Sequence, residues 1–208
     1  MVSRNAASAQ EGSQPSPQLA GLVLCGGHSR RMGIDKALLQ VDGGPLVLRV
    51  ASRLADVADP VLLAPGVPGR FAATGYAEVA DVEPARGPLG GLVAGLLVSP
   101  HPNVAVVAVD MPYASPAVIR LLARVCADGA WDAALPVTSS GPEPLHAVYS
   151  QRAAGPLRAA LADGRLAMHH AIADLRIALL DREAWGDADP SGRFAANLNT
   201  REDLALLA

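Results

Sequence analysis

A glycine-rich, basic turn that directly follows an apolar strand constrains this chain more than any other feature. Residues 20–25 are apolar and predict a buried strand, and the next residues bring together a glycine pair and three cations: Gly26, Gly27, Arg30, Arg31 and Lys36. Because glycine has no Cβ, backbone N–H groups at such a turn can approach an anion closely. The turn therefore predicts a cradle for a polyphosphate, and a nucleoside triphosphate is the expected class of substrate.

The spacing within this turn excludes two common phosphate-binding motifs. A Walker-type loop ends in Gly-Lys-Ser/Thr, but here Asp35 precedes Lys36 and Ala37 follows it. A dinucleotide-binding motif needs G-x-G-x-x-G opening directly into a helix, whereas this turn has basic residues among its glycines. A glycine pair alone would also suit a simple tight turn, so the basic residues carry the prediction.

Apolar runs alternate with amphipathic stretches along the rest of the chain. We expect strands over residues 20–25, 61–64, 77–82, 104–109, 133–137, 145–149 and 177–180, and helices over 45–57, 88–98, 116–125, 153–162, 166–175 and after Thr200. The helix over 116–125 should be capped by Ser115, begin at Pro116 and bury a stripe of Val118, Leu121, Leu122 and Val125. This alternation favours an α/β fold with a mainly parallel sheet. Ligands of such sheets bind beyond the carboxyl ends of the strands, so the glycine turn and Asp110 should open onto one crevice.

Composition limits the classes of partner and the number of domains. We expect one domain over residues 20–208, preceded by a disordered lead-in over residues 1–19 that has no secretory apolar segment. The net charge of −3 gives no electrostatic case for binding nucleic acid or an acidic membrane, and no apolar run is long enough to span a bilayer. The two cysteines have neither metal-site nor disulfide spacing, which is typical of the reducing cytoplasm.

Three side chains near the predicted crevice each allow two interpretations. Asp110 follows an apolar strand, where a carboxylate can bind a hard cation such as Mg²⁺ or cap the turn before a proline. Lys36 is either a nucleotide ligand or a solvated lysine, and Asp35 either orients Lys36 or caps a turn.

His146 lies in a strand-like stretch and is expected to be structural. The adjacent His169 and His170 point in two directions on a helix, which disfavours a metal site.

Four segments in this order resemble the nucleotidyltransferases with a Rossmann-like fold: residues 24–37 (LCGGHSRRMGIDKA), 87–91 (GPLGG), 109–113 (VDMPY) and 197–200 (NLNT). The Asp-Lys pair at 35–36 is similar to the molybdenum cofactor guanylyltransferases, whereas relatives that activate sugars or make cytidine-linked metabolites usually have Pro-Lys there. The resemblance covers residues 20–208. It implies a three-layer α/β/α fold with a mainly parallel sheet.

The resemblance also implies roles for individual residues. Asp110 would bind Mg²⁺, with Arg30 and Lys36 as the other catalytic residues, and Cys25 would act through its backbone. Asp81 is the expected acidic contact to the nucleotide, with Glu83 as the alternative, because the register of this segment is open. The implied nucleotide-binding set is Leu24, Cys25, Gly26, Gly27, Lys36, Asp81 and Asp110, and the implied pterin-side set is Asn197, Asn199 and Arg165.

By the same resemblance, the terminal phosphate of molybdenum-loaded molybdopterin attacks the α-phosphate of GTP, and pyrophosphate leaves. The implied partners are GTP, molybdenum-molybdopterin and, transiently, molybdoenzymes or proteins that deliver the cofactor. A cytidylyltransferase acting on the same cofactor and a non-catalytic nucleotide-binding adaptor are the two alternatives. Residues 63–66 lack the asparagine that the family often has after its second strand, so base recognition is expected to use backbone groups.

Overall fold

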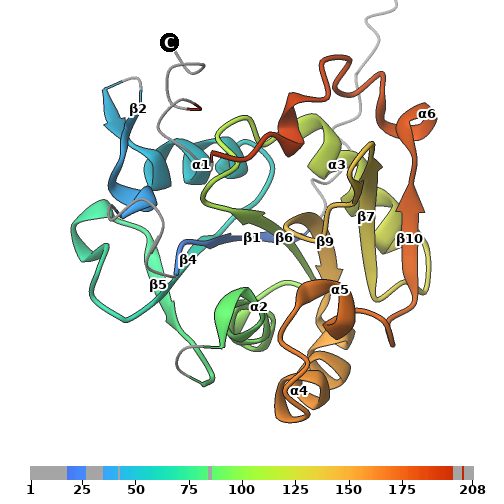
Figure 1. The fold of residues 1–208 in the computed structure, drawn as a ribbon, viewed down its shortest axis with the longest axis horizontal. Helices are drawn as coiled ribbons and strands as arrows, with labels where there is room; N and C mark the ends of the chain where they lie inside the picture. The colour runs from blue at the N-terminus through green and yellow to red at the C-terminus, as the bar shows by residue number, and fades with distance from the viewer. Residues whose placement is uncertain (1–17, 27–34, 42, 84–85, 199–202, 204–208) are drawn as a thin grey trace, which may run out of the picture.

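A single mixed sheet organises the computed structural model, which describes residues 18–26, 35–41, 43–83, 86–198 and 203 (Figure 1). The strands run in the spatial order β10-β7-β9-β6-β1-β4-β5, and β8 (Gly141–Pro142) pairs with β7. Their bounds are β1 Leu19–Leu24, β4 Val61–Gly66, β5 Ala77–Ala80, β6 Asn103–Ala108, β7 Ala133–Thr138, β9 His146–Ser150 and β10 Ile177–Leu180. A second, two-stranded sheet joins β2 (Gln40–Val41) to β3 (Gly44–Pro45).

Most neighbouring strands of the large sheet are parallel. β1 pairs in parallel with β4 and β6, β4 with β5, and β7 with β10, whereas β9 runs antiparallel to both β6 and β7. Every residue of β1 is buried, as expected of a strand whose two faces are both covered. The mainly parallel α/β sheet predicted from the sequence is therefore confirmed.

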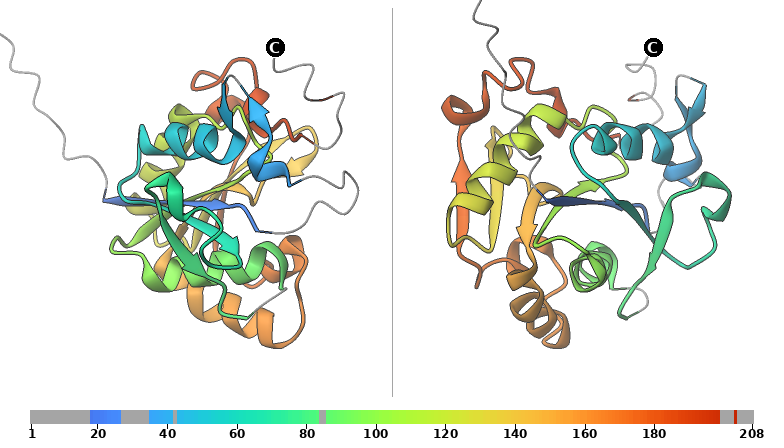
Figure 2. Two further views of the ribbon diagram at one scale, coloured as in Figure 1. Left: turned by 90° about the vertical axis from the view of Figure 1, so that its left-hand side faces the viewer. Right: turned by 180° about the vertical axis from the view of Figure 1, so that it is seen from behind.

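Helices cover both faces of the sheet and complete the three layers (Figures 1 and 2). One face carries α1 (Leu46–Ala55) and α3 (Pro116–Asp128), and the other carries α2 (Gly87–Val98), α4 (Ala154–Ala162) and the short α5 (Met168–Ala171). Alternate residues of β1 serve the two cores: Val23 packs in the α1 and α3 core, and Leu22 in the α2 and α4 core. α2 packs closely on the sheet, because a methyl group added at Gly95 would lie 2.4 Å from a Leu22 methyl carbon.

Several predicted boundaries need correction. Leu19 is buried within β1 rather than part of the lead-in, while residues 1–17 lie outside the described part of the chain. Within residues 166–175 only the four-residue α5 is helical. The chain then turns back toward β10, and just before that strand the Arg176 carbonyl oxygen accepts from the Asp132 amide. The terminal helix expected after Thr200 falls on residues that are outside the description except for Asp203.

The buried stripe of α3 is also displaced from its predicted position. Ser115 caps the helix by accepting from the Val118 amide, and Pro116 occupies the first turn, as predicted. The predicted stripe was Val118, Leu121, Leu122 and Val125, but the residues buried are Val118, Ile119, Leu122, Ala123 and Cys126. The helix is rotated so that its small residues face the sheet, and Leu121 and Val125 lie at the edge of the core. Among the described residues, no helix is long and apolar enough to cross a membrane.

Candidate active site

A cleft of about 1130 Å³ opens at the carboxyl ends of β1, β4, β5 and β6. Its described walls are residues 24–26, 35–37, 64–70, 81, 87–88, 91, 108–110 and 145. The start of the glycine turn and Asp110 both belong to these walls, which confirms that they open onto one crevice. The cleft is large enough for a nucleotide, since ligand pockets commonly measure roughly 300–1,000 Å³.

Lys36 and Asp110 form an ion pair in the cleft wall. Lys36 Nζ lies 3.3 Å from Asp110 Oδ2, and the two side chains are 18% and 27% exposed. The backbone around Asp110 is fixed on two sides, because Val109 N donates to Leu24 O at 3.0 Å and Leu198 N donates to Asp110 O at 2.8 Å. A partly open carboxylate and an ammonium group are thus held next to each other on rigid backbone.

Asp35 caps the turn in which Lys36 lies. Its carboxylate accepts from the Ala37 amide at 3.1 Å and so caps the 3-10 helix η1 (Lys36–Leu38). The same carboxylate pairs with Arg70, whose Nε lies 3.0 Å from Asp35 Oδ2. Of the two roles that the sequence left open for Asp35, the structure shows the turn cap.

Of Asp81 and Glu83, Asp81 lines the cleft and Glu83 does not. Asp81 follows β5 and lies opposite the start of α2, where a methyl group added at Gly91 would be 3.4 Å from Asp81 Oδ1. Burial raises the pKa of Asp81 above its usual range. Glu83 instead pairs with Arg86 at 2.8 Å and does not line the cleft. The preference for Asp81 is consistent with this placement.

Cys25 and Gly26 contribute backbone to the cleft. The Cys25 amide donates to Ala64 O at 3.0 Å, and burial raises the pKa of the Cys25 thiol to about 12, so the thiol stays protonated and unreactive. Gly26 lies so close to β4 that an added methyl group would be 3.2 Å from Gly66 N. Leu24 also lines the cleft, whereas Gly27, Arg30, Arg31 and Asn199 lie outside the described residues.

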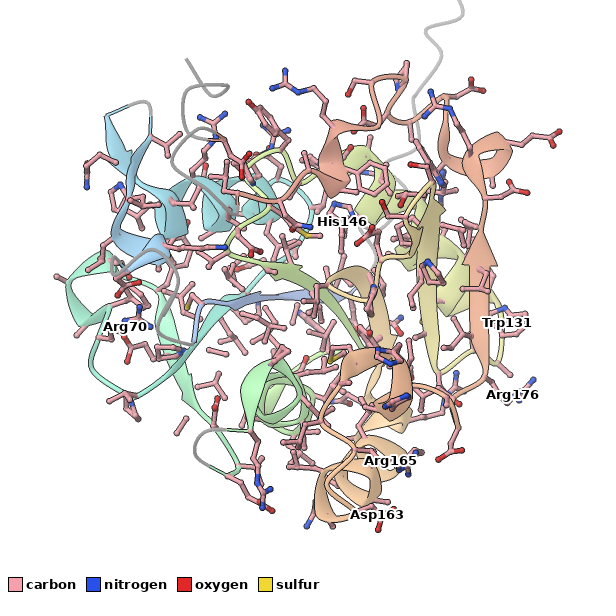
Figure 3. All side chains as sticks on the ribbon, in the orientation of Figure 1. Arg70, Trp131, His146, Asp163, Arg165 and Arg176 are labelled. Atoms are coloured by element: carbon pink, nitrogen blue, oxygen red, sulfur yellow. The ribbon has the colours of Figure 1, made fainter. Side chains whose placement is uncertain are left out.

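The two described pterin-side residues have different surroundings. Asn197 is exposed and directly precedes Leu198, whose amide is bonded to Asp110 O, so its segment borders the Asp110 end of the cleft. Arg165 is not among the residues that line the cleft, and its role toward a pterin stays a prediction. Its guanidinium is held by Asp174 at 2.8 Å and Asp163 at 3.4 Å beside α4 (Figure 3).

Arg70 is the residue of this site that the sequence patterns missed. Its Nη1 donates to the carbonyl oxygens of Cys25 at 2.8 Å and Pro65 at 3.2 Å, in addition to the bonds with Asp35 (Figure 3). It belongs to the segment between β4 and β5, which shows no periodicity. An arginine between a glycine and an aromatic residue was the only signal in the sequence.

Three of the described histidines, His146, His169 and His170, have surroundings unlike those of a metal site. His146 is fully buried, its Nε2 accepts from the Ser115 amide at 3.0 Å, and burial lowers the pKa of His146 to about 4, which confirms a structural role. His169 and His170 stack on each other with ring centroids 4.0 Å apart. Within the described part of the chain, no group of three or more His, Cys, Asp or Glu side chains could hold a metal ion.

The chain shares its Rossmann-like α/β fold with solved structures. The crystal structure of molybdopterin-guanine dinucleotide biosynthesis protein A from Archaeoglobus fulgidus matches it with a TM-score of 0.80 at 24% identity, covering 90% of this chain and 96% of that one. The 2-C-methyl-D-erythritol 4-phosphate cytidylyltransferase of Thermus thermophilus matches with a TM-score of 0.64 at 17% identity, covering 89% and 95%.

Sequence similarity identifies the family to which the chain belongs. Residues 21–177 match the family described as MobA-like NTP transferase domain. The chain is 30% identical over 187 residues to the molybdenum cofactor guanylyltransferase of Desulfosudis oleivorans, covering 89% of this chain and 92% of the relative. It is 38% identical over 167 residues to that of Burkholderia ambifaria, covering 72% and 79%. The chain belongs to the MobA-like NTP transferase family.

Proposed function

We propose that this protein transfers GMP from GTP to the terminal phosphate of molybdenum-loaded molybdopterin, with release of pyrophosphate. The observation that carries this proposal is the Lys36–Asp110 pair, with its 3.3 Å separation, in a nucleotide-sized cleft of a MobA-like chain. Relatives of similar length are named molybdenum cofactor guanylyltransferases, which supports guanine as the base and the cofactor precursor as the acceptor.

The proposed reaction is an in-line displacement at the α-phosphorus of GTP. An oxygen of the acceptor phosphate forms the new P–O bond, while the bond between the α-phosphorus and the α–β bridging oxygen breaks. The electron pair of that bond leaves with pyrophosphate. Because the attacking phosphate is already an anion, the reaction needs no protein base. Catalysis by this chain then consists of positioning and of charge neutralisation by Lys36 and the glycine turn.

Asp110 is the residue that would hold Mg²⁺. Its carboxylate is partly open to the cleft and supplies hard oxygen ligands, and Mg²⁺ is commonly bound by one or two carboxylates together with water and substrate phosphates. A single carboxylate therefore fits this ion, although it would not suit a metal that needs several protein ligands. When bound, Mg²⁺ supplies neutralisation of the triphosphate charge. Lys36, 3.3 Å from the same carboxylate, would bind phosphate oxygens from the neighbouring position.

We further propose that the rim of the cleft formed by residues 64–69 binds the guanine base through backbone groups. This rim contains only alanine, proline, glycine and valine, so its polar groups are those of the backbone. Asp81, opposite the start of α2, would contact the nucleotide from the other wall. Asn197, next to the backbone that holds Asp110, would lie toward the pterin.

A transfer assay tests this proposal. Purified protein is incubated with Mg²⁺, molybdenum-molybdopterin and either GTP, CTP or ATP, and pyrophosphate release and the dinucleotide product are measured. We expect pyrophosphate release and a guanine dinucleotide with GTP. Turnover with CTP instead would assign the protein to the cytidylyl branch. Nucleotide binding without turnover would identify an adaptor, and either result would contradict the proposal.

A further inference from the structure

We propose that Arg70 is a positioning residue of the nucleotide site and that it acts through Asp35 on Lys36. This inference rests on the proposed function only in assigning Lys36 to the phosphates of a nucleotide. Arg70 lies 35 residues from Asp35 in the sequence, but its guanidinium meets the Asp35 carboxylate at the cleft wall. Figure 3 shows Arg70 on the side of the molecule formed by η1 and the segment before β5.

The guanidinium of Arg70 is engaged on all three nitrogen atoms. Nε lies 3.0 Å from Asp35 Oδ2, Nη2 bonds the same oxygen, and Nη1 donates to the Cys25 and Pro65 carbonyls. The Arg70 side chain is only 18% exposed although it lines the cleft. These four bonds use four of the five N–H donors of the guanidinium. The bonding pattern therefore favours positioning over direct contact with the substrate.

The backbone on both sides of Arg70 is held as well. The amides of Gly69 and Phe71 both donate to the Glu78 carboxylate, which belongs to β5. The Phe71 ring is buried and its centroid lies 4.9 Å from the guanidinium carbon. Arg70 is thus anchored to the edge of the sheet, so its guanidinium is a fixed point for the groups that it binds.

From Arg70 the chain of contacts leads to the reacting end of the cleft. Asp35 caps η1 through the Ala37 amide, and Lys36 is the first residue of that helix. Lys36 Nζ then reaches Asp110 at 3.3 Å. A single 3-10 turn has poor hydrogen-bond geometry of its own, so its position depends on such outside contacts. Loss of Arg70 would free the Asp35 carboxylate to move. The start of η1, and with it the backbone of Lys36, would then be held less firmly.

The expected size of this effect follows from how sharply phosphate transfer depends on geometry. A displacement of about 1 Å in a group that positions a substrate can cost ~10²-fold in rate. Arg70→Met keeps an unbranched stem but removes the guanidinium and all of its hydrogen bonds, so we expect a loss of GTP affinity of ~10-fold and a larger loss in kcat.

A double-mutant cycle separates this role from general destabilisation. Arg70→Met, Lys36→Ala and the double variant are compared for calorimetric Kd of GTP with Mg²⁺, for kcat and for Tm. When Lys36 is present, Arg70→Met should weaken GTP binding ~10-fold. In the Lys36→Ala background the same substitution should weaken it less than ~2-fold, since coupled residues are non-additive. The Tm decrease should be the same in both backgrounds.

Two further variants and a control keep the test decisive. Arg70→Lys retains the charge facing Asp35 but loses the fork to two carbonyls, and it should recover part of the affinity. Arg152→Met removes an arginine that donates to the Trp131 carbonyl at 2.8 Å outside the cleft walls, and its GTP affinity should equal that of the wild type.

Equal losses of affinity in both backgrounds, or no loss from a folded Arg70→Met protein, would overturn the role of Arg70. If Arg70→Met does not fold, the cycle is read with Arg70→Lys, and full additivity there overturns the inference in the same way. Failure of the proposed function is a separate result: the wild type would then bind GTP without transferring GMP, or bind none.

Discussion

At the carboxyl ends of β1, β4 and β6, charged side chains stay partly open to the cleft, whereas around β7 and β9 polar side chains are buried with partners inside the protein. Lys36 and Asp110 illustrate the first region, with side chains 18% and 27% exposed. In the second region, the Tyr149 hydroxyl donates to Pro144 O at 2.9 Å and Trp185 Nε1 donates to Val137 O at 3.0 Å. The comparison teaches that one sheet supplies both a rigid frame and a site, and that the site lies where polar groups remain open to a ligand.

The largest effect is expected from Asp110→Ala, which removes the carboxylate that pairs with Lys36 but leaves the backbone hydrogen bonds on either side of it. We expect turnover to fall at least ~10²–10³-fold, by analogy with loss of other groups that stabilise charge in transition states. Thermal unfolding should show an intact fold. Asp128→Ala, which removes an exposed carboxylate at the end of α3 outside the cleft walls, is the matched control. Near-normal activity of Asp110→Ala with unchanged metal dependence would contradict the assignment of Asp110.

A substitution in the buried region should affect stability and spare nucleotide binding. Leu157 is fully buried on α4, so Leu157→Ala should lower the free energy of unfolding by about 2–5 kcal/mol. GTP affinity of the folded protein should not change. The neighbouring exposed Arg158→Ala should alter stability by less than ~0.5 kcal/mol. A clear loss of affinity in Leu157→Ala would show that the two regions are coupled.

Burial gives His146 in β9 and Asp81 in the cleft opposite effects on how stability depends on pH. Burial lowers the pKa of His146 from 6.5 to about 4, so the unfolded chain binds this proton more readily than the folded protein. The stabilisation is complete above pH 6.5 and is lost as the pH falls toward 4, on the order of 3 kcal/mol. Urea titrations at several pH values give the free energy of unfolding as a function of pH. In His146→Gln this free energy should change less between pH 6.5 and pH 4 than in the wild type. An equal change would assign the pH dependence to other groups.

Asp81 should produce the smallest effect, with the opposite sign. Burial raises its pKa above 3.8, so the folded protein holds this proton more tightly than the unfolded chain. The contribution is present below pH 3.8 and is lost as the pH rises through the raised pKa. Asp81→Asn should therefore raise Tm slightly at pH 7 while weakening GTP binding. A lower Tm in this variant would mean that the carboxylate stabilises the fold.

The sequence predicted the parts of this protein that depend on local patterns. The apolar runs of β1 and β6 identified central strands, and Ser115 with Pro116 identified the start of α3. The expectation that the glycine turn and Asp110 share one crevice follows from strand topology alone. Local signals were sufficient because each of these features is set by neighbours in the chain.

Contacts between distant segments could not be predicted in this way. The Arg70–Asp35 pair joins residues 35 positions apart, and no periodicity marks either end. The ion pairs of Arg165 with Asp163 and Asp174 beside α4 were likewise not marked by any pattern in the sequence. The face of α3 that is buried depends on the sheet below it, which favours Ala123 and Cys126 over the larger Leu121 and Val125. In each case tertiary packing decides what the local pattern leaves open.

Calorimetric titration of the purified protein with GTP, CTP and ATP in the presence of Mg²⁺ tests the central claim most directly. The account predicts selective binding of GTP, with the affinity strongly weakened in Lys36→Ala. Preferential binding of CTP, or GTP affinity that is unchanged in Lys36→Ala, would contradict it.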